Sequence, residues 1–320
     1  MASNRRFARL RPLPRPARGE LQELLLLALL SPFIVAPPPL ERLAARAVVA
    51  RQFRTGGWVR KERLRKLPPD LPGLTGTSAL QLAKKSEEES IRERTRVLRA
   101  IVFPWWKRRL TVGGLSNVRA GLAAGNGVIL WVHHCAESNV AVKQAMWSAG
   151  FPLAHLSRPG HPFSTRPFSV AILNPLLRRP EVRFLAERVP IDAGNTIAPL
   201  RRLQRLLSEN RAVSITVSRT ADQLEMFPFL GGMVMLPTGP ARLAARSGAP
   251  LLPVFTWAGD GRTHVEIGPP LPVTGTRPEQ IRSALAEAVH RLELRVVGHP
   301  EAWTGWRSQL FSVESPAATG

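Results

Sequence analysis

From residue 127 onward, the sequence alternates between short apolar runs rich in β-branched residues and longer stretches with helical periodicity. The apolar runs predict strands at residues 128–132, 152–157, 182–190, 212–218, 250–258 and 263–271. The periodic stretches predict helices at residues 139–149, 168–177, 197–210, 240–247 and 278–296. Strands that alternate with helices favour a sheet covered by helices on both faces. We therefore predict an α/β fold with a central mixed or mostly parallel sheet flanked by helices.

The N-terminal segment has a different composition. Residues 1–18 carry six arginines and three prolines and no acidic residue. The apolar run at residues 24–36 is shorter than the roughly 20 residues that a helix needs to span a bilayer. A basic segment before an apolar run is typical of a signal peptide, but no convincing cleavage site follows. A buried core helix is the alternative; we favour an N-terminal membrane-associated helix whose arginines meet anionic headgroups.

Between this segment and the α/β region lies a basic, helix-prone stretch. Residues 78–101 place charges of both signs around an apolar stripe, which predicts an amphipathic helix. We predict four regions in the chain. They are a basic N-terminus with a membrane anchor (1–40), a helical region (41–110), the α/β domain (111–311) and a C-terminal tail (312–320).

The charge of the chain is strongly positive. The 45 lysines and arginines outnumber the 23 acidic residues, for a formal net charge of +22. Such a balance indicates an anionic partner: a nucleic acid, an anionic membrane surface or a phosphorylated substrate. The excess of arginine also fits a GC-rich coding bias. Because the arginines are spread over the chain and form no recognisable nucleic-acid-binding module, no nucleic acid is expected as a partner.

The segment VHHCAESN contains the candidate catalytic residues His133 and His134, at the carboxyl end of the strand predicted at residues 128–132. Ligands of open α/β sheets bind at that edge, and imidazole is suited to general-base catalysis near neutral pH. Glu137 or Asn139 is a candidate partner for the second ring nitrogen. The residues alone do not decide which histidine acts, or which of these two orients it.

Two other interpretations of this segment, a metal site and a cysteine nucleophile, have weaker support. His133, His134 and Glu137 could supply metal ligands, but the HExxH spacing is absent and no metal or other cofactor is expected. Cys135, the single cysteine, lies beside the histidines and could be a nucleophile, although burial as a small apolar residue is favoured.

A second glycine- and proline-rich segment, FPFLGGMVMLPTGPARLAARSGAPLLPVF, occupies residues 227–255. Gly231 and Gly232 allow a tight turn or the close approach of a ligand to the backbone. The backbone amides at the helix start that follows could bind an anion. The third segment, HPEAWTGWRSQLF at residues 299–311, is rich in tryptophan, and packed aromatic side chains are sufficient to explain it.

Together these pieces resemble a known family. The order GVILWVHH-x4-N, SRPGHP, FPFLGG, PTGPARLAARSGAPLLPVF and HPEAW resembles the bacterial lipid A biosynthesis lauroyl/myristoyl acyltransferases. These belong to the lysophospholipid acyltransferase superfamily, which includes the phosphatidylinositol mannoside acyltransferases. The resemblance covers roughly residues 98–307. It implies a glycerolipid-acyltransferase-like α/β domain at the cytoplasmic face of a bacterial inner membrane, with the N-terminal apolar segment as a peripheral or single anchor.

The resemblance also selects residues. In the family the catalytic histidine lies seven positions after the glycine that opens the strand, which selects His134 when counted from Gly127. The family's His-x4-Asp/Glu pattern then places Asn139 where a carboxylate is expected. Counting from His133 leads to Ser138. Neither choice gives a carboxylate, so Glu137 and Asn139 both stay candidates for orienting the base.

The implied reaction moves a fatty acyl chain from a thioester of acyl carrier protein or coenzyme A to a hydroxyl of a lipid acceptor, with His134 as general base. His133, Arg158, Arg219, Gly231 and Gly232 are the candidate substrate-binding residues. Arginine is suited to bidentate phosphate contacts. The missing carboxylate also leaves open a catalytically impaired relative that binds lipid or carrier protein. The acceptor, the acyl length and the choice of donor are not fixed by the sequence.

Overall fold

The computed structural model describes residues 14–158, 160–191, 197–218, 221, 223–308 and 310–313. Among these residues, seven strands form the central sheet. They are β1 (Leu110–Gly113), β2 (Val128–Val132), β3 (Leu153–Ser157), β4 (Leu185–Pro190), β5 (Ala212–Thr216), β8 (Leu251–Gly259) and β9 (Arg262–Ile267). Their order is β1-β9-β8-β2-β5-β3-β4, and only the β8–β9 pair is antiparallel. The prediction of a mixed, mostly parallel sheet is confirmed.

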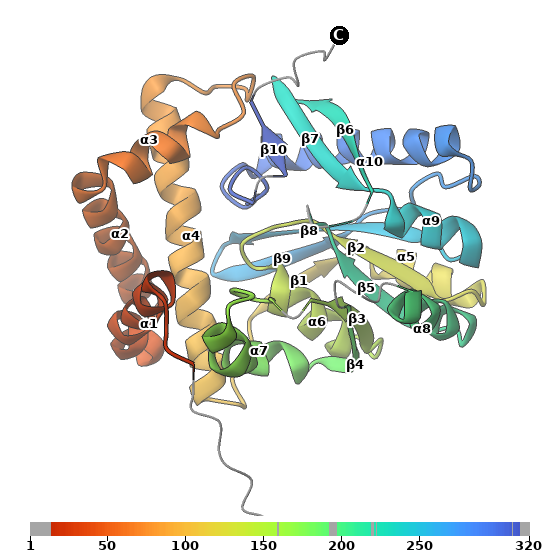
Figure 1. Ribbon diagram of the computed structural model, residues 1–320, viewed down its shortest axis with the longest axis horizontal. Helices are drawn as coiled ribbons and strands as arrows, with labels where there is room; N and C mark the ends of the chain where they lie inside the picture. The colour runs from red at the N-terminus through yellow and green to blue at the C-terminus, as the bar shows by residue number, and fades with distance from the viewer. Residues whose placement is uncertain are drawn as a thin grey trace, which may run out of the picture.

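Helices cover both faces of this sheet (Figure 1). The helices of the α/β region are α5 (Leu115–Ala123), α6 (Ser138–Ser148), α7 (Asn174–Val182), α8 (Ile197–Ser208), α9 (Gly239–Ser247) and α10 (Pro278–Gly298), with a π-helical turn, η2 (Ser169–Leu173), before α7. Strand β2 shows why both faces need cover, since all five of its side chains are buried. Val128, Leu130 and Val132 pack in one core with α5 and α6. Ile129 and Trp131 point to the other side, into the core shared with α8, α9 and α10.

Gly127 allows β2 to begin where it does. Its φ is +68°, and a Cβ there would lie 2.6 Å from the carbonyl oxygen of Arg211, the residue before β5. A larger residue would therefore separate the starts of β2 and β5, so this position favours glycine.

A smaller antiparallel sheet lies beside the central one. It consists of β10 (Phe311–Ser312), β7 (Gly232–Pro237) and β6 (Leu224–Phe229), in that order. No strands were predicted here from the sequence, and neither were β1 and α5. The strand predicted at residues 182–190 was wrong at residues 182–184, because α7 extends to Val182 and β4 starts only at Leu185.

The N-terminal region forms a separate helical layer (Figure 1). Its helices are α1 (Arg18–Leu30), η1 (Ser31–Val35), α2 (Pro38–Thr55), α3 (Gly57–Arg65) and α4 (Gly76–Val102). The long helix α4 contacts α1, α2, α3 and α7 and so connects this layer to the α/β region. The polar surface of α4 contributes to packing, because arginines and glutamates of this helix form buried ion pairs with both regions.

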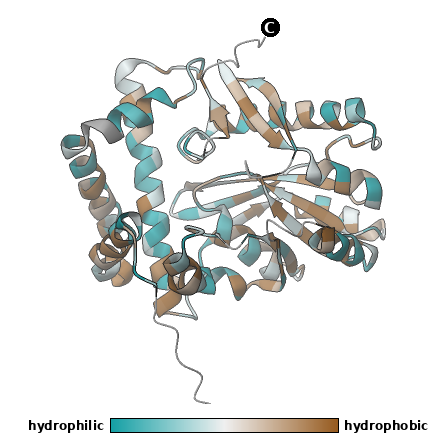
Figure 2. Cartoon of the chain, in the orientation of Figure 1, coloured by the Kyte–Doolittle hydropathy of each residue, from teal (hydrophilic) through white to brown (hydrophobic). Residues whose placement is uncertain are grey.

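The predicted membrane-associated segment forms α1 and η1. Among the described residues, no helix is long and apolar enough to span a bilayer. Figure 2 colours much of α1 as hydrophobic, next to long hydrophilic stretches of α4. The association of this segment with a membrane stays a prediction.

Candidate active site

The segment that follows β2 is held between a neighbouring strand and the C-terminal part of the chain. The backbone N–H of His133 donates to the carbonyl of Val254 on β8, at 2.9 Å. Cys135 then forms an isolated antiparallel bridge with Trp303. Helix α6 begins at Ser138, whose hydroxyl donates to the carbonyl of Cys135 at 2.9 Å. The two histidines therefore lie at the carboxyl edge of the sheet, where ligands of α/β proteins bind.

Thr304 is the hydrogen-bond partner of the His134 ring. Its Oγ1 lies 2.7 Å from His134 Nδ1 and 2.8 Å from the carbonyl oxygen of the same residue. The backbone N–H of Thr304 also donates to that carbonyl, at 2.8 Å. The neighbouring Trp303 is buried against Phe229 and Trp306, which fixes the backbone that carries Thr304.

This geometry assigns the tautomer of His134. A threonine hydroxyl has one proton to donate and two lone pairs to accept with. Both of its short contacts are hydrogen bonds only if the Thr304 O–H points to the carbonyl and the His134 Nδ1–H donates to Oγ1. The Nε2 atom of His134 then carries a lone pair, which is the form that a general base needs.

Burial keeps both histidines neutral. It lowers the pKa of His134 to about 4, and the positive charges of Arg307 and His161 act in the same direction. Burial also lowers the pKa of His133 to about 4. The buried Nδ1 atom of His133 has no hydrogen-bond partner among the residues that the structure describes, and its ring lies 5.9 Å from that of Trp131. His134 is the less buried of the two, with a hydrogen bond that orients it.

Cys135 is unsuited to act as a nucleophile. Burial raises the pKa of its thiol to about 12, so the reactive thiolate is disfavoured. Among the residues that the structure describes, no group of three histidine, cysteine or carboxylate side chains could hold a metal ion.

The Glu137 carboxylate lies in a buried cluster of cations. It pairs with Arg96 of α4, accepts a hydrogen bond from the hydroxyl of Thr263 on β9, and lies 3.7 Å from Arg108 Nη1. Burial lowers the pKa of Arg96 to about 10, and the nearby Arg92 adds to this effect. These contacts join the N-terminal layer to Glu137, three positions after His134. The predicted catalytic role of Glu137 is not tested by them and stays a prediction.

The other predicted site residues are distributed as follows. Asn139 is partly exposed in the first turn of α6, and Arg158 is partly exposed directly after β3, at the same sheet edge as His134. Arg219 lies outside the described residues. Gly231 is in the tight turn between β6 and β7, where a Cβ would meet the side chains of Pro69 and Asp70.

Gly232 is equally enclosed. A Cβ there would lie 2.4 Å from the carbonyl oxygen of Ser312 and 2.6 Å from the ring of Phe311. Both glycines therefore allow other segments of the same chain to approach their backbone closely. Contact of these glycines with substrate stays a prediction.

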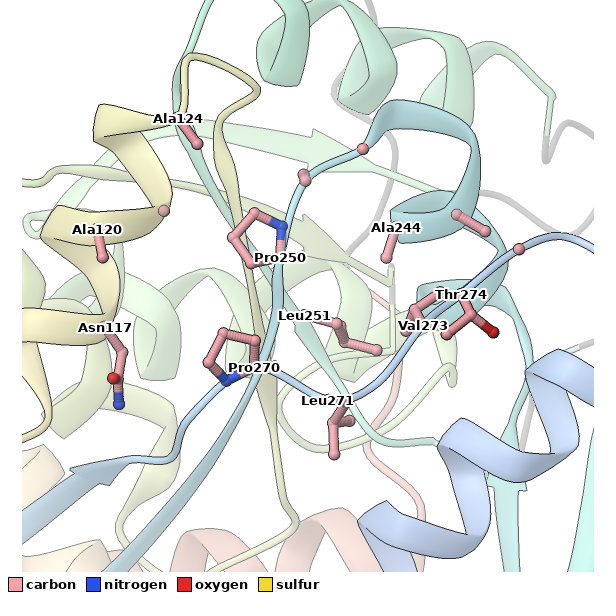
Figure 3. Close-up of a pocket in the computed structure, with 15 residues that line it drawn as sticks. Asn117, Ala120, Ala124, Ala244, Pro250, Leu251, Pro270, Leu271, Val273 and Thr274 are labelled. Atoms are coloured by element: carbon pink, nitrogen blue, oxygen red, sulfur yellow. The ribbon is translucent and has the colours of Figure 1, made fainter.

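A pocket of about 450 Å³ lies at the opposite edge of the sheet, near the start of β8 (Figure 3). Asn117 and Ala120 of α5, Ala244 of α9, and Pro250 and Leu271 are among its lining residues. Because β8 runs parallel to β2, the start of β8 is far from the carboxyl end of β2 that carries His134. This pocket is separate from the candidate active site.

An α/β fold with a histidine at the carboxyl edge of its sheet is the arrangement expected of the acyltransferases that the motifs resemble. The chain matches the family described as bacterial lipid A biosynthesis acyltransferase over residues 81–311, which is more than half of its 320 residues. It therefore belongs to that family, as its motifs indicated.

Among individual proteins, the chain is similar to a phosphatidylinositol mannoside acyltransferase of Mycobacterium tuberculosis. The two are 30% identical over 199 residues, which is 60% of this chain and 57% of the relative. The corresponding protein of a second strain of the same species has the same identity and coverage. The match thus spans little more than half the length of these relatives.

Proposed function

We propose that this acyltransferase moves a fatty acyl chain from a thioester of coenzyme A or acyl carrier protein to a hydroxyl group of a lipid, with His134 as general base. The observation that carries the proposal is the hydrogen bond between His134 Nδ1 and the Thr304 hydroxyl. It orients the ring at the carboxyl edge of the sheet and assigns the lone pair to Nε2. Membership of the family supports the acyl-transfer chemistry.

In this mechanism the acceptor hydroxyl gives its proton to His134 Nε2 while its oxygen attacks the thioester carbonyl carbon. The carbon–sulfur bond then breaks, and the thiol leaves with one proton. The products are an ester and a free thiol, and no acyl-enzyme is formed. Thr304 orients the ring throughout, but as a neutral group it offers no negative charge to stabilise the imidazolium.

The residues around His134 are proposed to bind the substrates. Arg158 is suited to a phosphate of the acceptor or of the phosphopantetheine arm, because guanidinium binds phosphate in a bidentate manner. We extend the same role to Arg219, and propose that His133, Gly231 and Gly232 border the substrate path. The name of the relative makes a mannosylated phosphatidylinositol the first acceptor to test.

The purified chain should be incubated with palmitoyl-coenzyme A or palmitoyl-acyl carrier protein and a panel of acceptors. The panel should include a phosphatidylinositol mannoside and a lipid A precursor. We expect thiol release together with an acylated lipid detected by mass spectrometry. Absence of thiol release with both donors and every acceptor would contradict the proposal.

One observation favours a second candidate function, a catalytically impaired relative that binds lipid or carrier protein. The ring partner of His134 is the neutral Thr304, and Asn139 stands at the position where the family pattern has a carboxylate. Loss of a carboxylate partner can slow a histidine-dependent enzyme by about 10⁴-fold. Saturable binding of acyl carrier protein or lipid without thiol release would support this candidate over the enzyme.

The Thr304 hydrogen bond makes a direct prediction. Thr304→Val removes the hydroxyl while keeping the shape of the side chain, so the ring loses its orientation and its assigned tautomer. We expect kcat to fall by about 10- to 100-fold, since one such hydrogen bond contributes about 1–3 kcal/mol. Thr304→Ser retains the hydroxyl and should stay close to wild type. Equal kcat values for the Thr304→Val variant and the wild type would show that the hydroxyl has no role.

We further propose that the protein docks on the cytoplasmic face of a bacterial inner membrane through the apolar face of α1. Leu21, Leu25 and Leu29 of that face are 46%, 70% and 57% exposed. They are spaced four residues apart, so they lie along one side of the helix. The arginines of residues 1–18 precede this face and suit an anionic lipid surface.

This surface can be tested with Leu25→Glu. The change places a charge in the apolar face and removes a leucine that contributes about 1.5–3 kcal/mol when buried. Binding to vesicles of phosphatidylglycerol and phosphatidylethanolamine should weaken at least about tenfold in a sedimentation assay. The matched control is Leu294→Glu, an exposed leucine on α10. Equal loss in the two variants would argue against docking through α1.

A further inference from the structure

A second imidazole at the same sheet edge is paired with a carboxylate. His161 follows β3, and its Nε2 lies 2.8 Å from Oε2 of Glu181 on α7. The other oxygen of Glu181 lies 3.4 Å from Lys143 Nζ on α6 and 3.6 Å from His155 Nε2 on β3. Glu181, Lys143 and His155 are buried, whereas the side chain of His161 is 23% exposed. The pair therefore has a buried carboxylate and an imidazole that reaches solvent.

The charges in this cluster keep Glu181 ionised. Although burial opposes it, the nearby Lys143 and His161 hold the pKa of Glu181 well below its usual range. Burial lowers the pKa of His155 well below its usual range, so that ring is neutral, and its Nδ1 lies 2.9 Å from Ser214 Oγ. An ionised carboxylate accepts the Nε2–H of His161, which leaves the Nδ1 atom of that ring available for another proton transfer.

The loop that carries His161 is fixed by α7 at two places. Besides the contact with Glu181, Asn174 is fully buried and accepts the backbone N–H of Phe163 at 3.1 Å. Its amide also donates to the carbonyl of Ser164, at 2.7 Å. The position of His161 is therefore set by the fold rather than by an unrestrained loop.

His161 lies at the same edge of the sheet as His134. The strands β2, β5 and β3 are parallel neighbours, so the segments that follow them share the carboxyl edge of the sheet. The positive charge of a protonated His161 contributes to the lowered pKa of His134. The edge thus holds one imidazole with a neutral hydroxyl partner and one with a carboxylate partner. Pairs of titratable groups in such unequal surroundings divide the acid and base roles in enzymes.

We propose that His161, oriented by Glu181, is a second catalytic residue, which donates a proton to the sulfur of the departing thiol. This inference rests on the proposed function. His134 Nε2 takes the proton of the attacking hydroxyl, the carbon–sulfur bond breaks, and its electron pair on sulfur takes the proton from Nδ1 of protonated His161. One proton enters the enzyme and one leaves it, and exchange with water restores both rings. Glu181 is a positioning residue, since it acts through His161.

The test compares two acyl donors that differ in their need for a proton. The coenzyme A thiol is weakly acidic and leaves best with a proton, whereas thiophenol is acidic enough to leave as the thiolate. Single-turnover thiol release is measured for His161→Gln with palmitoyl-coenzyme A and with S-palmitoyl thiophenol, so that transfer to lipid and hydrolysis are both counted. We expect about a 10²-fold loss with the coenzyme A donor and a loss of only a few-fold with the thiophenol ester.

Three variants complete the experiment. Glu181→Gln should show the same donor dependence, whereas a purely structural defect would slow both donors equally. His134→Ala should also slow both donors equally, because each needs the base. His290→Gln, at an exposed position on α10, should affect neither.

Three outcomes overturn the assignment. An equal loss with both donors in His161→Gln, or no loss with either, shows that the ring does not serve the leaving group. A wild-type protein that cleaves neither donor overturns the proposed function itself, and the role of His161 with it.

Discussion

His134→Ala is expected to reduce the rate of acyl transfer by about 10²- to 10⁴-fold, the range that a positioned general base contributes. The variant removes Nε2, which takes the proton of the acceptor hydroxyl in the proposed mechanism. Thr304 keeps its hydrogen bond to the carbonyl of residue 134, because that bond involves only the backbone of the histidine. The fold should therefore persist. The measurement is single-turnover thiol release, with circular dichroism and thermal unfolding of the same preparation.

The matched control is His290→Ala, which removes an exposed imidazole from α10 and should leave the rate unchanged. A folded His134→Ala protein with full activity would end the assignment of His134. A loss confined to one acceptor would instead indicate that the residue binds that acceptor and does not take its proton.

The second large effect is on stability. Glu137→Ala removes a buried carboxylate and leaves Arg96 and Arg108 facing each other with one fewer negative charge between them. Breaking a buried ion pair by removing one partner typically costs about 3–5 kcal/mol. Because Arg96 keeps Glu41 and Arg108 keeps Glu93 as partners, the lower end of that range applies here. We expect the free energy of unfolding to fall by that amount in a urea titration, with an unchanged dependence on denaturant concentration.

A surface pair provides the control. Glu279→Ala removes the partner of Arg277 in an ion pair whose two side chains are 65% and 72% exposed. Such pairs contribute about 1 kcal/mol or less, so unfolding should hardly change. If Glu137→Ala were as mild as this control, the buried cluster would not be what holds the N-terminal layer to the α/β region.

The central strands of the fold were predictable because a strand that is buried on both faces is apolar at every position, a pattern that is easy to recognise in a sequence. The run VILWV is apolar at every position, and its ends are marked by Gly127 and by the histidines. The hairpin of β6 and β7 was missed although a signal was present. Leu230 and Gly231 both have positive φ, at +44° and +76°, as the two-residue turn of a hairpin requires. The glycine pair was interpreted as allowing a tight turn, but the apolar runs on either side of it were not predicted to be strands.

The candidate site was predictable only in part. The resemblance to the family, counted from Gly127, selected His134, and the structure places this residue at the expected edge of the sheet. Thr304 was missed, because 170 residues separate it from His134 and a lone threonine in a tryptophan-rich segment carries no local signal. The ion pairs of Glu137 were also missed. Their partner Arg96 is one of many arginines on α4, and only packing decides which of them is buried.

The pairing of His134 with Thr304 also has a consequence for the order in which the molecule becomes active. A ribosome adds roughly 5–20 residues per second, so the 170 residues between the two positions take about 10–30 seconds to synthesise. During that interval the histidine has emerged without the hydroxyl that sets its tautomer. In the proposed mechanism, a nascent chain whose apolar N-terminal helix has already reached a lipid surface would thus stay inactive until its last segments have folded into place.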